Sequence, residues 1–250
     1  MTTYLCIATY NERENVPRLV AEIRARLPQA HLVVVDDNSP DGTGELLDDL
    51  ARQDPRLHPR HRAGKLGYGS AHREAMAYAL AQGAEVVLTM DADFSHDPKY
   101  LPDLVGLVEQ GADLAVGSRY VPGGGTQDWP WHRRCLSATA NALARWGLGL
   151  PVHDCTGGFR AYRAELLRQL PLANFRSEGY SFLEEILVAA DEAGAQMRET
   201  PIVFVERRAG ASKISKHVIF EAAWLLARMT WRRQVRRLCQ PSRSSADAGR

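Results

Sequence analysis

Two acidic residues separated by a single residue follow a short apolar run near the middle of the chain. The run is Val86-Val87-Leu88-Thr89-Met90, and the acidic residues after it are Asp91 and Asp93. A brief aliphatic segment rich in β-branched residues is typical of a buried strand. Paired carboxylates suit a divalent ion that bridges phosphates, but Asp is also common in turns and at helix starts. The spacing alone supports both interpretations equally.

Two earlier strand-like segments also end in polar or acidic residues. The segment 4–9 runs into Tyr10-Asn11-Glu12, and the segment 31–35 runs into Asp36 and Asp37. Each is followed by a helix-like pattern, and this alternation predicts βαβ units with a mainly parallel sheet. Ligands bind such sheets beyond the carboxyl ends of the strands. We therefore expect an α/β, Rossmann-like fold with its site at these ends.

The acidic residues at the strand ends are expected to converge on one cleft. Glu12, Asp37, Asp91 and Asp93 would repel one another unless a cation or ligand donors offset their charge. A metal–nucleotide complex supplies both. Asp91 and Asp93 would hold the metal, and Asp37 could accept hydrogen bonds from a base or ribose.

Other acidic residues and a histidine are assigned structural roles. We expect Asp36 and Asp41 to be turn formers and His96 to cap the helix that follows it. Glu184 and Glu185 could include a general base, although a solvated helix face accounts for at least one of them.

The remaining elements follow from hydrophobic periodicity. We expect helices over 16–27, 45–52, 70–82, 100–109, 136–148, 181–193 and 216–238, and further strands over 114–116 and 202–205. The polar segments 54–62 and 154–160 are expected to be loops. The segment Gly64-Lys65-Leu66-Gly67-Tyr68-Gly69 lacks both dinucleotide and Walker spacing, so close approach to a ligand and a plain flexible loop remain equally open.

Four cations lie in predicted loops or just beyond strands. They are Arg119, Arg133, Arg207 and Lys213. A single exposed Arg is usually a solvated surface group, but Arg also binds phosphate oxygens in a bidentate fork. Four such residues facing an acidic metal site would suit a reaction with phosphate on both substrates.

Composition excludes several classes of protein. The 250 residues are 45% hydrophobic and 24% charged with a net charge of +1, typical of a globular protein and unlike a general nucleic-acid binder. The four cysteines are scattered without zinc spacing or a disulfide framework. No signal-peptide pattern and no membrane-spanning run is present, so we expect a reducing, cytosol-facing setting.

The C-terminal part of the sequence has a different character. Residues 216–239 predict an apolar helix with two tryptophans and a basic end, which suits either packing on the core or a membrane surface. Residues 240–250 are expected to be disordered. We therefore divide the chain into a catalytic domain over 1–215, this helix, and a tail.

The motifs together resemble family 2 glycosyltransferases of the GT-A fold. The first of these are Ala8-Thr9-Tyr10-Asn11-Glu12-Arg13, Val34-Val35-Asp36-Asp37-Asn38-Ser39 and Asp91-Ala92-Asp93-Phe94-Ser95-His96. The segments Gly117-Ser118-Arg119-Tyr120, Thr156-Gly157-Gly158-Phe159-Arg160 and Glu206-Arg207-Arg208-Ala209-Gly210-Ala211-Ser212-Lys213 are similar to those of dolichyl-phosphate (polyprenyl-phosphate) mannose synthases. Their order and spacing are specific, and the resemblance covers about residues 4 to 215.

The resemblance implies transfer of mannose from GDP-mannose to a polyprenyl monophosphate with inversion. The guanosine site would be lined by Ala8, Tyr10, Glu12, Val35 and Asp37. Asp91 and Asp93 would hold Mg²⁺ or Mn²⁺ on the diphosphate, with Ala92 and Ser95 adjoining. Arg119 and Arg133 would face the phosphates with Ser137 nearby, and Arg207 and Lys213 would close over the donor.

Several rival functions remain open. A UDP-glucose-dependent polyprenyl-phosphate glucosyltransferase would keep the fold and change the sugar, whereas a nucleotidyltransferase or a non-catalytic nucleotide-sugar-binding protein would change the chemistry. The implied enzyme would be peripheral on the cytoplasmic face of a membrane, with a separate membrane protein as a possible anchor. Lipid chain length, the metal ion and the oligomeric state are not specified by the sequence.

Overall fold

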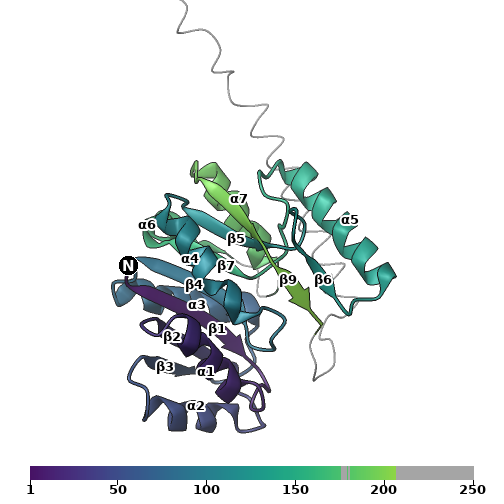
Figure 1. Cartoon of the computed structure of the whole chain (residues 1–250). Helices are drawn as coiled ribbons and strands as arrows, with labels where there is room; N and C mark the ends of the chain where they lie inside the picture. The colour runs from purple at the N-terminus through teal and green to yellow at the C-terminus, as the bar shows by residue number, and fades with distance from the viewer. Residues whose placement is uncertain (176–178, 180, 207–250) are drawn as a thin grey trace, which may run out of the picture.

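The computed structural model describes residues 1–175, 179 and 181–206, which form a central sheet with helices on both faces (Figure 1). The sheet has the strand order β3-β2-β1-β4-β7-β5-β8. Its strands are β1 (Thr3–Thr9), β2 (His31–Asp36), β3 (Leu57–His61), β4 (Val86–Asp91), β5 (Leu114–Ser118), β7 (Arg160–Arg163) and β8 (Met197–Pro201). The prediction of an α/β fold with a mainly parallel sheet is confirmed.

Helices and a small second sheet complete the fold. The α-helices are α1 (Val16–Arg26), α2 (Thr43–Ala51), α3 (Tyr68–Ala81), α4 (Leu101–Glu109), α5 (Trp131–Leu148), α6 (Ala164–Gln169) and α7 (Phe182–Glu192). Short 3₁₀ helices occupy Pro98–Tyr100 and Leu172–Asn174. Strands β6 (Gly125–Gln127) and β9 (Val203–Val205) pair in parallel beside the main sheet. Figure 1 shows α5 next to β6, at the opposite end of the molecule from α2.

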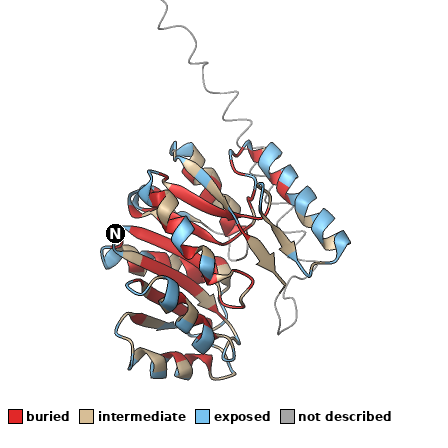
Figure 2. Ribbon diagram, viewed as in Figure 1, coloured by how far each residue is buried: buried red, intermediate tan, exposed pale blue. Residues whose placement is uncertain are grey.

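Alternation along the buried strands divides the core between the two faces of the sheet. On β1, Tyr4 and Cys6 contribute to the apolar cluster that contains α3 and α7, whereas Leu5 and Ile7 contribute to the cluster that contains α1 and α4. Successive side chains of a strand point to opposite faces, and a sheet covered on both faces needs apolar residues at both. This explains the continuous apolar runs, which are drawn as buried in Figure 2.

The order in which strands are added to the sheet reverses after β3. Strands β2 and β3 lie on one side of β1, and β4 lies on the other side. This reversal is a topological switch point, where open α/β sheets form a ligand crevice beyond the strand ends. The ligand crevice is therefore expected at the ends of β1 and β4. Tyr10 follows β1, and Asp91 is the last residue of β4.

The structure differs from the sequence predictions at three places. Residues 57–61 form the edge strand β3, which pairs in parallel with β2 and carries Pro59, a residue that an edge position tolerates. The predicted loop over 154–160 is confirmed up to Phe159, but Arg160 begins β7, a strand that was not predicted and that runs antiparallel to both β4 and β5. Helix α5 begins at Trp131 rather than Leu136, because Pro130 precedes it at the N-cap.

Strand β8 was also missed, because its residues Met197 to Pro201 mix polar and apolar side chains at the sheet edge. The predicted helix 216–238 and the domain divisions beyond 206 lie outside the described residues. Among the residues that the structure describes, every helix falls short of the length and apolarity needed to cross a bilayer.

Candidate active site

Three neighbouring strands bring their carboxyl ends to the same level. In the register of the sheet, Ala8 of β1 lies opposite Val35 of β2 on one side and Asp91 of β4 on the other. The Val35 side chain is wholly buried in the core, so only its backbone can border a ligand in the crevice. The structure thus brings together the predicted residues Ala8, Val35 and Asp91.

The segment after β4 folds into a tight acidic turn. Asp93 is 7% exposed, and its Oδ1 accepts a hydrogen bond from the backbone N–H of Ser95 at 3.0 Å. Phe94 has a φ of 61°, an uncommon value for a residue other than glycine, and Ala92 packs into the core. The Asp91 side chain at the strand end remains 23% exposed. The turn holds Asp93 just beyond the carboxyl end of β4, next to Asp91.

His96 does not cap the following helix as predicted. Asp97 does so, because its side chain accepts the Lys99 N–H. His96 is instead 1% exposed, stacks on Phe159 with ring centroids 4.9 Å apart, and accepts the Asp91 N–H on Nδ1 at 3.1 Å. Burial lowers the pKa of His96, although the nearby Asp91 and Asp93 carboxylates oppose the shift. A neutral imidazole therefore supports the strand end.

The loop after β1 contains Tyr10 and Glu12, two residues of the predicted nucleotide site. The Glu12 N–H donates to Thr43 Oγ1 at 3.1 Å, and Glu12 Oε2 accepts a hydrogen bond from the Asn15 side chain at 2.8 Å. The Lys65 ammonium lies 3.8 Å from the centroid of the Tyr10 ring. A cation over a ring face is attracted by the ring quadrupole. The contact between Lys65 and Tyr10 therefore holds the segment 64–67 against the predicted nucleotide site.

Asp37 holds that same segment in place. Its Oδ1 accepts hydrogen bonds from Arg62 Nη1 at 2.7 Å and from the Leu66 N–H at 3.1 Å, and its Oδ2 accepts the Gly67 N–H at 2.9 Å. The Arg62 and Asp37 side chains are each 7% exposed. The segment 64–67 is therefore tied to the end of β2, and Asp37 positions it.

The two acids predicted to be turn formers are confirmed in that role. Asp36 accepts hydrogen bonds from the backbone N–H of Ser39 at 2.9 Å and from the Thr9 hydroxyl at 3.3 Å. Asp41 accepts from the Thr43 N–H at 3.0 Å and lies at the start of α2. Both side chains stabilise the loops that follow β1 and β2.

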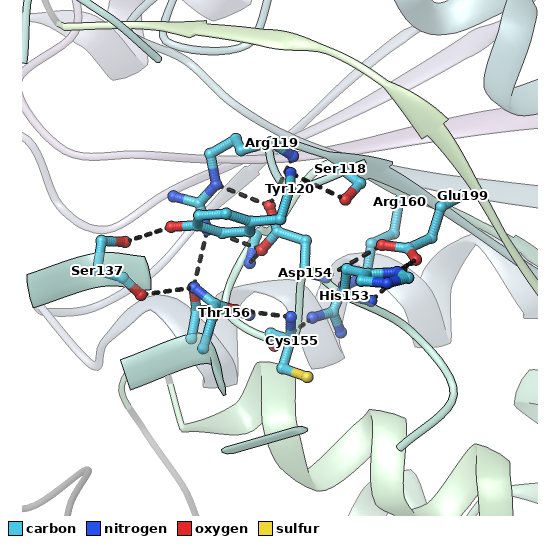
Figure 3. Close-up of polar contacts among 12 residues, drawn as sticks. Ser118, Arg119, Tyr120, Ser137, His153, Asp154, Cys155, Thr156, Arg160 and Glu199 are labelled. Atoms are coloured by element: carbon cyan, nitrogen blue, oxygen red, sulfur yellow. Dashed lines mark hydrogen bonds and ion pairs between the residues drawn. The ribbon is translucent and has the colours of Figure 1, made fainter. Parts of the chain in front are cut away.

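Arg119 makes a buried bidentate ion pair with Asp154 (Figure 3). Its Nε and Nη2 each lie 2.7 Å from an oxygen of that carboxylate, and Nη2 also donates to Thr156 Oγ1 at 2.8 Å. Burial alone would raise the pKa of Asp154, but the guanidinium and backbone donors lower it below its ordinary value. Arg119 is 9% exposed. The predicted phosphate ligand is thus oriented by an acidic residue that the sequence analysis did not single out.

Aromatic rings surround this guanidinium. The centroids of Tyr120, Trp129 and Phe204 lie 5.2, 5.9 and 5.5 Å from Arg119 Cζ. Arg133 lies 4.2 Å from the Trp129 ring centroid and forms an ion pair with Glu206. The structure therefore brings the two predicted arginines to a shared aromatic ring.

Helix α5 contributes the remaining predicted residue of this side. The Ser137 and Tyr120 hydroxyls lie 2.7 Å apart (Figure 3), and Asn141 Nδ2 donates to Thr156 Oγ1 at 2.9 Å. These bonds attach α5 to the strand-end loops that hold Arg119. Arg207 and Lys213, predicted to close over the donor, lie outside the described residues.

Sequence reasoning missed buried residues that act on the predicted ones. Asp154 lies in a glycine-bearing connection where a turn role is the ordinary expectation. His72 is 1% exposed, and burial lowers its pKa while Asp91 opposes the shift; its Nε2 has no hydrogen-bond partner within the described chain. Glu184, by contrast, was named as a possible general base, and burial raises its pKa to about 7. Residue spacing carries no signal for such tertiary contacts.

The donor chemistry at the β4 end fits a divalent metal. Carboxylate oxygens are the ligands that Mg²⁺ and Mn²⁺ prefer, and Asp91 and Asp93 supply them where the backbone turns away from the strand. Within residues 1–175, 179 and 181–206, no group of three or more His, Cys, Asp or Glu side chains gathers as a protein-only metal site. A metal held here would therefore complete its coordination with substrate or water oxygens.

A switch-point crevice with a paired carboxylate at one strand end is the architecture of GT-A glycosyltransferases. Glucosyl-3-phosphoglycerate synthase from Mycobacterium tuberculosis, solved with UDP, aligns with a TM-score of 0.65 and 19% identity over 92% of this chain and 80% of that one. The same enzyme solved with Mn²⁺, UDP and glucosyl-3-phosphoglycerate aligns with a TM-score of 0.62 and 20% identity over 97% and 81%. These likenesses show the fold.

The chain belongs to glycosyl transferase family 2, whose model matches residues 4–170. It is 47% identical over 226 residues to a polyprenol monophosphomannose synthase of Mycolicibacterium smegmatis, covering 90% of this chain and 85% of that one. It is 41% identical over 222 residues to an undecaprenyl-phosphate mannosyltransferase of Micrococcus luteus, covering 89% and 91%. The expectation of a family 2, GT-A enzyme is confirmed.

Proposed function

We propose that this enzyme transfers mannose from GDP-mannose to a polyprenyl monophosphate. The observation that carries the proposal is the arrangement of charged side chains at the strand ends, with carboxylates at the end of β4, Arg119 directly after β5 and Arg133 on α5. The mannosyltransferase names of the two relatives support the sugar and the class of acceptor. The GDP moiety rests on the resemblance of the strand-end motifs alone.

The donor would bind on the side formed by β1, β2 and β4. Ala8, Tyr10, Glu12, Val35 and Asp37 would border the nucleoside, with Asp37 acting through the segment 64–67 that it holds. Asp91 and Asp93 would hold a divalent metal, Mg²⁺ or Mn²⁺, with Ser95 beside them. When bound, that metal would act as a Lewis acid on the departing diphosphate. Arg207 and Lys213 are proposed to contact the same diphosphate.

The acceptor phosphate would bind on the side of Arg119, Arg133 and Ser137. The Asp154 carboxylate fixes the Arg119 guanidinium, so little reorganisation is needed when an anion arrives. A phosphate monoester is already an anionic nucleophile near neutral pH, so the reaction needs no strong general base. One acceptor oxygen forms a bond to the anomeric carbon as the bond to the diphosphate breaks, which inverts that centre and releases GDP.

The decisive experiment is transfer of radiolabelled mannose to a polyprenyl phosphate in detergent, with GDP-mannose and UDP-glucose as alternative donors. We expect transfer from GDP-mannose that EDTA abolishes and that Mg²⁺ or Mn²⁺ restores. Preference for UDP-glucose would overturn the proposed donor. Nucleotide-sugar binding without transfer would favour a non-catalytic protein, and release of pyrophosphate from a nucleoside triphosphate would favour a nucleotidyltransferase.

We further propose that the enzyme is peripheral on the cytoplasmic face of a membrane, where its lipid acceptor resides. A separate membrane protein could anchor it. Cell fractionation tests the first statement, and crosslinking in native membranes tests the second.

A further inference from the structure

Helix α5 buries only a narrow strip of its surface. Of its residues Trp131–Leu148, only Asn141, Ala144 and Leu148 are buried. Arg133, Ser137 and Gly147 are half-buried on the same side. An ordinary surface helix covers the core with an apolar stripe and presents polar residues outward, and α5 departs from this arrangement.

The outward face of α5 carries most of the large exposed apolar side chains of the described chain. Trp131 is 76% exposed, Leu136 61%, Leu143 55% and Trp146 85%. Outside α5, only Met1 and Leu66 join this group among the described residues. Figure 2 shows the helix as a mainly exposed rod at the edge of the molecule. At about 1.5 Å per residue, the two tryptophans stand roughly 22 Å apart along the axis.

The charge of the helix is of one sign. Residues 131–148 contain Arg133, Arg134 and Arg145 and no Asp or Glu. Arg134 and Arg145 are exposed, and eleven positions apart they share one side of a helix. A helix with tryptophan and leucine on one face and arginine at its border suits the interface of a bilayer with anionic headgroups.

We infer that the outward face of α5, defined by Trp131, Leu136, Leu143 and Trp146, docks on the surface of an anionic lipid bilayer. The inference rests on the proposed function for its rationale, because the inward side of the same helix carries Arg133 and Ser137. Docking would place those acceptor-side residues at the level of a lipid phosphate. The apolar side chains enter the interface, and Arg134 and Arg145 contact headgroup phosphates.

Two other partners could cover this face of α5, and each predicts a different experimental result. A second copy of the chain would give concentration-dependent dimers that lose stability when the tryptophans are replaced. Residues 207–250 of the same chain would protect the face from both lipid and a second copy. The charged residues within 207–250 are predominantly basic, and a second copy would present the same basic helix. Neither supplies the acidic groups that the exposed Arg134 and Arg145 would favour, whereas anionic headgroups do.

The first experiment is sedimentation of the full chain with vesicles of phosphatidylcholine alone or mixed with phosphatidylglycerol. We expect binding to the anionic vesicles, weakened at high salt. The double variant Trp131→Ala/Trp146→Ala should bind at least about tenfold more weakly, because each indole leaves the interface. Arg145→Ala should weaken binding about fivefold, since one cation near an anionic surface contributes about 1 kcal/mol.

Matched substitutions separate docking from general loss of surface residues. Leu143→Ala should reduce vesicle binding, whereas Leu66→Ala removes a leucine of similar exposure, 53% against 55%, and should not. Arg52→Ala, at the C-cap of α2, is the control for Arg145→Ala, because the Arg52 side chain is 73% exposed. Equal effects of the matched pairs would overturn the inference.

The second experiment locates the helix in the bilayer. Vesicles that contain brominated lipids quench tryptophan fluorescence at the interface, and Trp131→Phe/Trp146→Phe keeps the face apolar. We expect this variant to bind but to lose much of the quenching. Unchanged quenching would assign membrane contact to another part of the chain and overturn the inference, as would dimers in place of vesicle binding.

A transfer assay distinguishes this inference from the proposed function. Trp131→Ala/Trp146→Ala should lower mannosyl transfer to a polyprenyl phosphate embedded in vesicles and leave transfer to the same acceptor in detergent micelles unchanged. If neither the wild type nor any variant transfers mannose, the proposed function is wrong. Sedimentation and fluorescence quenching would still decide whether α5 docks on the bilayer.

Discussion

Asp154 fixes both the backbone and the side chain of Arg119. Asp154 Oδ2 accepts the Arg119 backbone N–H at 3.0 Å and Nε at 2.7 Å, while Oδ1 accepts Nη2 at 2.7 Å. Asp154 Oδ1 also accepts the Gly157 N–H at 2.9 Å. One carboxylate thus determines the conformation of the loop after β5 and the direction in which its arginine points.

Replacing Asp154 should therefore damage both stability and transfer. Asp154→Asn leaves a buried guanidinium without its anion, and we expect the free energy of unfolding to fall by about 3 kcal/mol. Chemical denaturation measures this change. Asp49→Asn, which breaks an ion pair with Arg52 whose side chains are 59% and 73% exposed, should leave stability within experimental error. A stable Asp154→Asn variant with full activity would contradict the positioning role of Asp154.

The carboxylates at the end of β4 should be needed for chemistry rather than for folding. We expect Asp91→Asn and Asp93→Asn each to reduce kcat for mannosyl transfer by about 10²-fold or more, because charge stabilisation of the leaving group is lost. The metal concentration at half-maximal rate should rise in parallel. Asp97→Asn is the matched control, since Asp97 lies in the same segment but caps the next 3₁₀ helix. Equal losses in all three variants would point to misfolding of the turn.

The ion pair between Arg62 and Asp37 should control donor affinity. Arg62→Ala removes a buried donor from Asp37 and loosens the segment that places Lys65 over Tyr10. We expect KM for the nucleotide sugar to rise about tenfold, in keeping with about 1.5 kcal/mol for a charge-assisted hydrogen bond, with a smaller change in kcat. Arg60→Ala is the control, because Arg60 lies on β3 two residues before Arg62 and has a half-exposed side chain 3.7 Å from Glu74. A rise in the acceptor KM alone would refute this role.

Glu184 should make stability depend on pH. Burial raises its pKa from an ordinary value of 4.5 to about 7, and Oε2 has no hydrogen-bond partner among the residues described. The folded state then binds a proton that the unfolded state releases, so the Glu184 contribution to stability is present below about pH 4.5 and is lost as pH rises through 7. Glu184→Gln should match the wild type at about pH 4 and exceed it at pH 8 by about 1–3 kcal/mol.

Thermal or chemical unfolding at the two pH values checks this prediction. Glu165→Gln on α6 is the control, because its side chain is 63% exposed and should give no pH-dependent difference. A Glu184→Gln variant that is less stable than the wild type at pH 8 would show that the ionised carboxylate has a partner in the folded state.

The sheet and its crevice were predictable because they depend on local patterns. Apolar runs ending in acids identified β1, β2 and β4, and the parallel topology required their ends to meet near Ala8 and Asp91. Strand β7 was not predictable, because four residues beginning with a buried Arg160 carry no strand periodicity. The Arg160 guanidinium is accommodated by the carbonyl oxygens of Leu183 and Cys155, distant in sequence from one another.

The same limit applies to the site. Residue types and spacing predicted Asp91 and Asp93, because metal chemistry needs paired oxygens at a strand end. The roles of Asp154, Arg62 and His96 depend on contacts made only when the chain has folded. Each of them forms a hydrogen bond with a predicted residue: Asp154 with Arg119, Arg62 with Asp37, and His96 with Asp91. His96 was misassigned for this reason, since its partner is the Asp91 N–H five residues earlier.

The antiparallel strand β7 separates β4 from β5 and so determines the distance between the ends of these two strands. Neighbouring strands lie about 4.8 Å apart, so the end of β4, with its acids, and the end of β5, with Arg119, are roughly 10 Å from each other across the sheet. Two polyanions held at these ends would remain separated by enough room for a hexose to pass between them. A sheet in which β4 lay directly beside β5 would bring the two phosphates of the proposed reaction into mutual repulsion. On the proposed function, the short strand β7 would therefore act as a spacer that leaves room for the transferred sugar.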